Sequence, residues 1–168
     1  MSISTQQVDF AREQAGARGV DDRVRFHFRN MLDTGFPTAG FNLIWTNETT
    51  MYVDLPAAFG EFSRMLRPGG RYVCVTGAYD DTHGIKAAAV TAIDRHYELN
   101  VHPRSAYFAA LAANHLVPIK VADLTADALP YWQLREQCPD LRTGVEEHFL
   151  QAFREGSMHY LLIVADHL

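Results

Sequence analysis

The chain has 168 residues, of which 48% are hydrophobic and 21% charged. This length and composition suit one globular domain with a sizeable core and exclude a disordered chain. The formal net charge is -5, and Lys and Arg form no run, which argues against a binder of duplex nucleic acid. No segment approaches the roughly 20 consecutive apolar residues that a transmembrane helix needs, so no membrane span is expected.

The N-terminus and the two cysteines indicate the compartment. Residues 1–7 lack the basic and apolar regions of a signal peptide. Cys74 lies within an apolar strand pattern, and Cys138 precedes Pro139 in an expected loop, so both are expected to be free thiols. Because free thiols are usual in the cytoplasm, we predict a cytoplasmic protein.

The N-terminal part of the chain predicts one helix and one strand. Apolar residues recur at helical spacing over 6–16, and glycines at 16 and 19 would end this helix. Residues 24–28 alternate between apolar and polar side chains, which is typical of a half-buried strand. A polar turn over 30–35 follows.

A strand over 41–45, which leads into polar residues up to Glu48, is followed by a helix that begins at Asp54, a good N-cap residue. A Pro-Gly-Gly turn at 68–70 separates this helix from a second strand over 71–77. Such a unit is typical of a parallel α/β sheet. Ligands of these sheets bind at the C-terminal ends of the strands, where the polar residues of this unit gather.

The rest of the chain continues the α/β pattern. Helices are expected over 85–99, 105–114 and 144–155, strands over 117–124 and 159–165, and an irregular segment over 129–132. Because no repeat, linker or low-complexity segment interrupts this pattern, we expect no domain boundary within residues 1–168.

Glu48 is the first candidate for chemistry, because it follows a run of apolar strand residues and would lie at the mouth of a crevice. The nearest basic residues in the sequence, Arg29 and Arg64, are far along the chain. Burial of a carboxyl group without a cationic partner raises its pKa toward the range that suits a general base. The alternative stays open that Glu48 only caps the following helix or lies in solvent at a strand end.

Two common kinds of catalytic site find no support. The eight histidines show no recognised metal-ligand spacing, and neither a CxxC nor an HExxH motif occurs. The GxSxG motif of serine hydrolases does not occur either. The sequence therefore predicts neither a metal centre built from protein ligands nor a serine nucleophile.

Several segments together resemble a known enzyme family. Residues 66–71 are similar to the turn before the fifth strand of class I S-adenosylmethionine-dependent methyltransferases, and residues 41–48 to their fourth strand. Residues 47–55, 96–102 and 129–132 closely resemble the geranyl diphosphate 2-C-methyltransferases of that superfamily. The resemblance covers nearly the whole chain. It implies a partial Rossmann-like α/β sheet, mostly parallel with an antiparallel C-terminal strand and with helices at its sides.

The resemblance also implies a reaction: a methyl group passes from S-adenosylmethionine to C2 of geranyl diphosphate, or of a related prenyl diphosphate. The product would be 2-methylgeranyl diphosphate, for terpenoids of the 2-methylisoborneol type. Glu48 corresponds to the family's base, and Tyr97 to an aromatic residue that stabilises the cation. The family has phenylalanine at the latter position. Tyrosine keeps the π-face, but its hydroxyl needs a hydrogen-bond partner.

Further roles follow from the same resemblance. Water would trap the cation, so Trp45, Tyr52, Tyr79 and Trp132 are candidates for the wall of the substrate pocket. Packing in the core is the alternative for each of these aromatic side chains.

Other residues are candidates for binding the substrate diphosphate and the cofactor. The family's diphosphate is held with Mg²⁺, a hard ion that binds phosphate oxygens, and His102 and Arg104 are the candidates for that end of the substrate. Asn30 and Met31 resemble the turn that contacts adenine, and Asn47 lies at the strand end near the expected cofactor.

Part of the family pattern does not occur in the chain. The Gly-rich turn after the first strand and the acidic residue at the end of the second strand have no match. We expect residues 1–168 to be the C-terminal two-thirds of a single methyltransferase domain, without strands 1 and 2. The alternative to an enzyme of this kind is a non-catalytic remnant or a binding subunit. Open sheet edges also predict self-association into a homo-oligomer.

Overall fold

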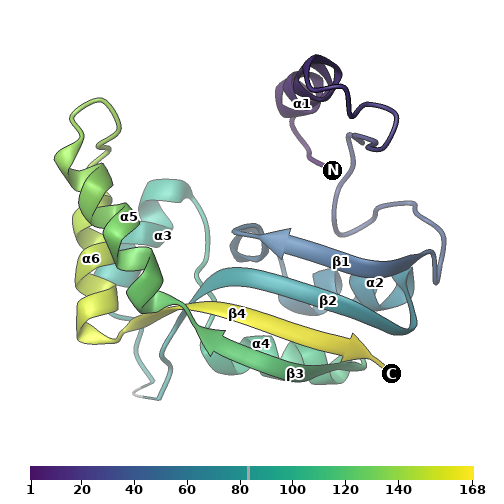
Figure 1. Ribbon diagram of the computed structural model, residues 1–168. Helices are drawn as coiled ribbons and strands as arrows, with labels where there is room; N and C mark the ends of the chain where they lie inside the picture. Colours follow the sequence, from purple (N-terminus) through teal and green to yellow (C-terminus); the bar gives the residue numbers. More distant parts are fainter. Residues whose placement is uncertain (83) are drawn as a thin grey trace. The chain divides into compact units, whose positions relative to one another are not determined.

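The computed structural model describes residues 1–82 and 84–168, and Figure 1 shows its elements. The described residues form two compact units, Met1–Pro37 and Thr38–Leu168. The first unit holds one helix, and the second holds the sheet and the other helices. Among the described residues, no helix is long and apolar enough to cross a membrane. Both cysteines are free thiols, as predicted.

The N-terminal unit confirms the expected helix but not the expected strand. Helix α1 spans Thr5–Ala17, and its N-cap, Ser4, accepts a hydrogen bond from a backbone N–H of the first turn. The prediction of a strand over 24–28 is wrong, because this segment makes only an isolated parallel bridge between Ser2 and Phe28. A strand needs a ladder of partners, and the short extended piece before α1 supplies a single bridge.

The second unit is built on a four-stranded sheet. Its strands are β1 (Phe41–Asn47), β2 (Leu66–Tyr79), β3 (Leu116–Asp123) and β4 (Met158–His167), in the order β1-β2-β4-β3. β1 and β2 are parallel, whereas β4 is antiparallel to both β2 and β3. The α/β fold with an antiparallel C-terminal strand is therefore confirmed. Parallel pairing among the described strands is limited to β1 and β2.

Two helices cover one face of the sheet. α2 (Leu55–Met65) and α4 (Arg104–Ala113) lie behind it in the view of Figure 1. α2 begins where the sequence predicts, because the side chain of Asp54 accepts a hydrogen bond from a backbone N–H in the first turn. The rings of Phe59 on α2 and Tyr72 on β2 are fully buried, with centroids 5.5 Å apart. This layer forms the larger part of the core.

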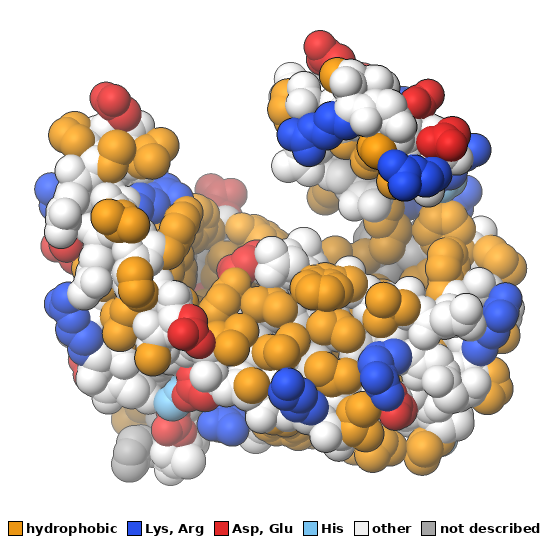
Figure 2. All heavy atoms as spheres, in the orientation of Figure 1, with side chains coloured by type: hydrophobic (Ala, Val, Ile, Leu, Met, Phe, Trp, Pro, Cys, Tyr) orange, Lys and Arg blue, Asp and Glu red, His pale blue; other side chains and the backbone are white. Residues whose placement is uncertain are grey.

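The other face of the sheet carries exposed apolar side chains. Leu43 and Trp45 of β1 are 52% and 63% exposed, and Val117 of β3 is 40% exposed. Figure 2 shows hydrophobic side chains spread over this part of the surface. Trp45 therefore lies outside the core of this unit.

Three more helices gather beyond the end of the sheet where β2 stops and β4 starts (Figure 1). They are α3 (Ala88–Tyr97), α5 (Thr125–Gln137) and α6 (Glu146–Glu155), and a short 3-10 helix, η1 (Thr50–Tyr52), follows β1. α6 packs against both α3 and α5. A second apolar cluster that includes Ile93, Phe149 and Met158 holds this group together.

Helix α5 corrects the expectation of an irregular segment. Pro130 lies inside the helix, where proline removes a backbone hydrogen bond. Contacts with α6 compensate: the Trp132 ring stacks on Phe149 with centroids 3.7 Å apart, and Arg135 donates a 2.8 Å hydrogen bond to Glu146. Residues distant in sequence thus override the local signal of the proline.

Strand β2 begins earlier than its sequence pattern indicates. It starts at Leu66 and includes the Pro-Gly-Gly segment 68–70. Its pairing with β1 is irregular there, with a register shift between Phe41 and Leu43. Gly69 has a φ of +74°, which glycine adopts without a steric cost. The predicted turn at 68–70 is therefore part of strand β2, where the pairing with β1 is irregular.

Replacing the helix cap tests how far α2 depends on Asp54. Asp54→Ala should lower the free energy of unfolding by about 1 kcal/mol, because one backbone N–H of the first turn loses its partner. Urea unfolding of the wild type and the variant measures the difference. Asp140→Ala, in an exposed turn, is the control. An equal loss in both variants would contradict the capping role.

Candidate active site

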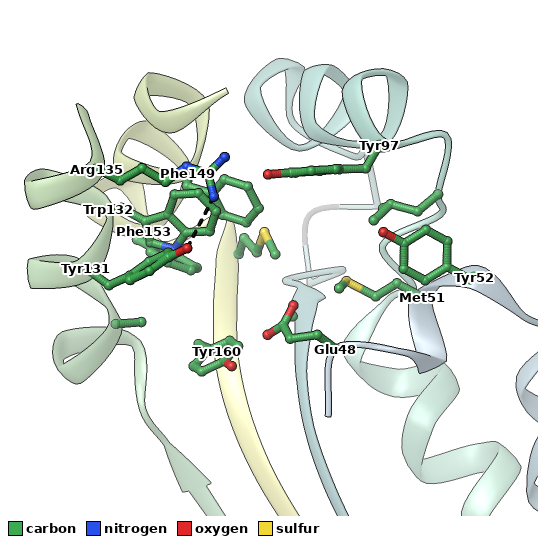
Figure 3. A pocket seen from close by; sticks show the side chains of 14 residues that line it. Glu48, Met51, Tyr52, Tyr97, Tyr131, Trp132, Arg135, Phe149, Phe153 and Tyr160 are labelled. Carbon is green, nitrogen blue, oxygen red and sulfur yellow. Dashed lines mark hydrogen bonds between the residues drawn. The ribbon is translucent and has the colours of Figure 1, made fainter. Parts of the chain in front are cut away.

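A cavity of about 420 Å³ opens between the end of the sheet and helices α3, α5 and α6. Figure 3 shows the side chains that line it. Most of them are apolar or aromatic, with one carboxylate and one guanidinium among them. The lining consists of Glu48, Met51, Tyr52, Gly77, Tyr97, Leu99, Ala128, Tyr131, Trp132, Arg135, Phe149, Phe153, Met158 and Tyr160.

The backbone at the end of β1 brings Glu48 into this cavity. In a regular strand, residue 48 would point to the same face as Thr46, which is buried and hydrogen-bonded to Tyr72. Instead Glu48 has a left-handed φ of 56°, while its N–H still donates a 2.9 Å hydrogen bond to Val75 O. A non-glycine residue in this conformation is strained, and such strain is common at functional sites.

Burial shifts the acid-base properties of Glu48. It raises the pKa of the carboxyl group, and a hydrogen bond from the Tyr160 hydroxyl lowers it in part. The arginine of the cavity, Arg135, pairs with Glu146 instead. Glu48 is therefore a buried carboxyl whose charge is stabilised mainly by a phenol. Of the two alternatives from the sequence, burial without a cationic partner and a solvated or capping position, the structure has the first among the described residues.

Aromatic rings face Glu48 from the helices. Tyr97 lies in the last turn of α3, and Figure 3 shows its hydroxyl directed into the cavity. Burial raises the pKa of Tyr97, so the phenol stays neutral. Its ring centroid is 6.4 Å from that of Phe149, which in turn lies 5.9 Å from that of Phe153. Together with Trp132 these rings form an apolar wall with several π-faces.

Arg135 is held at the cavity wall by a second carboxylate. Glu146 is fully buried and pairs with Arg135 Nε at 2.8 Å. Burial alone would raise the pKa of Glu146, but hydrogen bonds from Thr143 and Gly144 and the Arg135 guanidinium lower it to about 2. Arg135 Nη1 also donates a 3.2 Å hydrogen bond to the Tyr131 hydroxyl. The guanidinium is thus fixed in one orientation beside the aromatic wall.

The sequence did not indicate Arg135, Tyr131 or Tyr160 as site residues. Arg135 and Tyr131 lie on a helix that the sequence pattern missed. Tyr160 lies on β4, where it pairs with Gly77 of β2, a residue that is remote in sequence. No spacing rule links them to Glu48. One local signal pointed to this region: the residues Thr143 and Gly144, just before Glu146, resemble the start of a helix.

The structure brings together four of the predicted residues. Glu48, Tyr52, Tyr97 and Trp132 all line the cavity. Trp45 is exposed on β1, and Tyr79 packs under Lys86, whose Nζ is 5.0 Å from the ring centroid. Neither ring belongs to the lining. The expected pocket wall is therefore formed by helix residues more than by strand residues.

His102 and Arg104 lie away from the cavity. His102 borders a neighbouring open groove that shares Met51, Tyr52 and Leu99 with the cavity. Its Nε2 donates a 3.0 Å hydrogen bond to Val53 O, and its Nδ1 accepts one of 3.3 Å from Asn100. Burial lowers the pKa of His102, so the ring is neutral. Both ring nitrogens are thus engaged within the protein, and the histidine contacts the backbone at Val53.

The residues expected near the cofactor lie in different parts of the chain. Asn47 is exposed at the end of β1. Asn30 and Met31 belong to the N-terminal unit, where the Asn30 side chain accepts a 3.0 Å hydrogen bond from the N–H of Leu32. In the described residues, no group of three or more His, Cys, Asp or Glu side chains could hold a metal ion.

The pKa of Glu48 depends on Tyr160, which gives a direct test of the site. Tyr160→Phe should raise the pKa of the Glu48 carboxyl further, because the substitution removes the donor that favours the charged form. A pH titration of the carboxyl carbon chemical shift measures this. Tyr131→Phe, whose hydroxyl bonds to Arg135, should leave the titration unchanged. Identical curves for wild type and Tyr160→Phe would contradict the contact.

Comparison by sequence with known proteins finds methyltransferases. A family model described as a methyltransferase domain matches residues 1–74. Geranyl diphosphate 2-C-methyltransferase of Saccharopolyspora erythraea is 56% identical over 99% of this chain and 58% of its own length. The enzyme of the same name from Streptomyces lasalocidi is 46% identical over 99% of this chain and 55% of its own. The chain thus spans little more than half the length of these relatives.

Solved structures agree with the sequence comparison. A geranyl diphosphate methyltransferase in complex with SAM is 46% identical, with a TM-score of 0.97 over 99% of this chain and 67% of that one. The Streptomyces coelicolor A3(2) geranyl diphosphate C-methyltransferase, in complex with Mg²⁺, geranyl diphosphate and S-adenosyl-L-homocysteine, is 44% identical, with a TM-score of 0.95 over 99% of this chain and 63% of that one. At this level of identity and coverage, the chain belongs to the geranyl diphosphate methyltransferase family.

Proposed function

We propose that the chain is the substrate-binding and proton-removing part of an S-adenosylmethionine-dependent C-methyltransferase. Its substrate would be geranyl diphosphate or a related prenyl diphosphate, and its product 2-methylgeranyl diphosphate, for terpenoids of the 2-methylisoborneol type. One observation carries the proposal: a buried carboxyl with a raised pKa, Glu48, shares an apolar cavity with the π-face of Tyr97. The names and ligands of the relatives support the same chemistry.

The cavity residues have distinct tasks in this reaction. The π electrons of the prenyl C2=C3 double bond would form a bond between C2 and the methyl group of S-adenosylmethionine, whose methyl–sulfur bond would break and leave its electron pair on sulfur. A cation would then remain at C3. The face of the Tyr97 ring attracts the cation, and the apolar wall around Trp132 excludes the water that would trap it. The Glu48 carboxylate then takes the proton from C2. The electron pair of that C–H bond restores the double bond.

Arg135 is our candidate for the diphosphate end of the substrate, because its guanidinium lines the cavity and its fork geometry suits phosphate oxygens. Mg²⁺ would be held by diphosphate oxygens and water, since the described residues supply no metal-binding cluster. His102 does not fit this task, because both of its ring nitrogens are engaged. Arg104 lies outside the cavity lining.

The cofactor would lie at the C-terminal ends of β1 and β2. Asn47 is exposed there, and the hydroxyl of Thr49 is buried without a hydrogen-bond partner among the described residues. The family resemblance assigns Asn30 and Met31 to the adenine. We propose that residues 1–168 correspond to the C-terminal two-thirds of one methyltransferase domain. The free thiols Cys74 and Cys138 favour the cytoplasm as its compartment.

A chimera tests the proposed function. Residues 1–168 replace the matched region of the Saccharopolyspora erythraea relative, and the product from geranyl diphosphate and S-adenosylmethionine is identified by mass spectrometry. Formation of 2-methylgeranyl diphosphate is expected. A folded chimera that binds geranyl diphosphate without methylating it would favour the alternative of a non-catalytic remnant or binding subunit.

The role of Glu48 as the base predicts a large effect on the rate. In the chimera, Glu48→Gln should lower turnover by about 10²–10⁴-fold, the range for a lost general base. Glu98→Gln is a matched control, because Glu98 also has a left-handed backbone but borders the neighbouring groove. Turnover is measured at saturating substrate. Wild-type turnover in Glu48→Gln would remove this residue from the mechanism.

The role of Tyr97 predicts a difference between two substitutions. Tyr97→Phe keeps the π-face and should retain most of the activity of the chimera. Tyr97→Leu loses the π-face and should cost on the order of 1–2 kcal/mol of transition-state stabilisation, as measured by kcat/KM. Equal values for the two variants would make Tyr97 a packing residue only.

A further inference from the structure

Three buried hydroxyl groups lie on the side of β2 opposite to the cavity. Thr50 of η1, Thr76 of β2 and Tyr107 of α4 are each fully buried. The Thr50 hydroxyl is 3.1 Å from that of Thr76 and 2.9 Å from that of Tyr107, and the latter two are 2.9 Å apart. These residues, called the hydroxyl triad below, are mutually hydrogen-bonded and join three elements of the fold. The Thr50 hydroxyl also contacts Cys74 Sγ at 3.8 Å, and the Thr76 hydroxyl also donates a 3.3 Å hydrogen bond to Gly77 O.

The triad fastens the segment that carries Glu48. Thr50 lies two residues after Glu48, and its hydroxyl joins η1 to β2 and α4 by hydrogen bonds. The backbone of the segment is held at further points: Met51 O accepts a 2.9 Å hydrogen bond from the N–H of Asn100, and His102 bonds to Val53 O. Residues 48–53 are therefore attached on both sides of the cavity rim.

Such attachment matters because the conformation of Glu48 is strained. A left-handed backbone at a glutamate persists only when its surroundings determine it, and Glu48 has a φ of 56°. Its N–H is bonded to Val75 O on the strand side. On the other side, the next side chain that is fixed by hydrogen bonds to a different element is Thr50.

We propose that Thr50, Thr76 and Tyr107 are positioning residues, which hold Glu48 in its left-handed conformation and thereby keep its carboxylate in the cavity. The inference rests on the proposed role of Glu48 as the base. A general base must lie within hydrogen-bonding reach of the proton that it takes. A displacement of about 1 Å can lower a rate by about 10²-fold.

The chain offers a matched control for the triad. Tyr72 is also a fully buried phenol, and its hydroxyl is 2.7 Å from that of Thr46. Both partners of this pair lie on strands that are already paired with each other. Tyr107→Phe and Tyr72→Phe therefore each remove one buried hydroxyl from the same core layer. Only Tyr107→Phe removes a partner of the segment that carries Glu48.

The first test uses the 168-residue chain and the chemical shift of the Glu48 carboxyl carbon. Thr50→Val keeps the size of the side chain but loses its hydroxyl, whereas Thr50→Ser keeps the hydroxyl. Thr50→Val and Tyr107→Phe should move the pKa of Glu48 down toward its ordinary value, because a loosened segment lets water reach the carboxyl. Thr50→Ser and Tyr72→Phe should leave it where it is.

Other titrating groups do not mimic this shift, because the Thr50 substitutions leave them all in place. The groups that face Glu48 from the cavity or lie behind it are Tyr52, Cys74, Tyr97, Tyr107, Tyr131, Arg135 and Tyr160. An unchanged pKa in Thr50→Val, or equal shifts in Tyr107→Phe and Tyr72→Phe, would overturn the proposal.

The second test uses the chimera described above. Thr50→Val should lower kcat by at least about 10-fold with little change in the KM for geranyl diphosphate, and Thr50→Ser should restore kcat. A rise in KM with unchanged kcat would overturn the positioning role. The two tests distinguish the two proposals. A chimera with wild-type residues that does not methylate would overturn the proposed function. The pKa shifts in the 168-residue chain would still show whether the triad positions Glu48.

Discussion

The site depends on one largely buried carboxyl group, Glu48, which has no cationic partner among the described residues. Burial of a carboxylate costs free energy unless charge or hydrogen bonds compensate. In the part of the chain that the structure describes, the compensating donor to Glu48 is the Tyr160 hydroxyl. The strained backbone at Glu48 adds a further cost. Neither cost helps the chain to fold. The proposed function gives a reason for both costs. To remove a proton beside a cation, Glu48 must be basic and must point into an apolar cavity.

The comparison with Glu146 shows that the environment, more than the residue type, sets these properties. Both carboxylates belong to the same end of the molecule, and both are largely buried. Glu146 accepts hydrogen bonds from two backbone N–H groups and pairs with Arg135, so its pKa falls to about 2. It stays charged and fixes the guanidinium. Glu48 lacks such partners, and its pKa is raised. Two carboxyl groups whose environments move their pKa values in opposite directions can take different roles within one site.

The sequence predicted the parts of this arrangement that depend on neighbours in the chain. β1, the N-cap Asp54 and the position of Glu48 at a strand end all follow from apolar spacing and capping rules. α5 escaped prediction because Pro130 is a strong local signal against a helix, whereas the Trp132 stack and the Arg135 pair that stabilise it come from α6. For the same reason the sequence could suggest His102 as a ligand but not reveal that Val53 and Asn100 occupy its two nitrogens.

β2 joins the core and the site, because successive residues of a strand point to opposite faces. Thr76 points to the hydroxyl triad behind the sheet, and the next residue, Gly77, lines the cavity. A Cβ at position 77 would clash with the terminal methyl of Met158 and contact the sulfur of Met51. The strand therefore combines a residue whose hydroxyl is hydrogen-bonded behind the sheet with one whose missing side chain leaves space for the methionines of the cavity wall. If Glu48 is the base, as proposed, two adjacent residues of β2 bear on its position and on the space beside it.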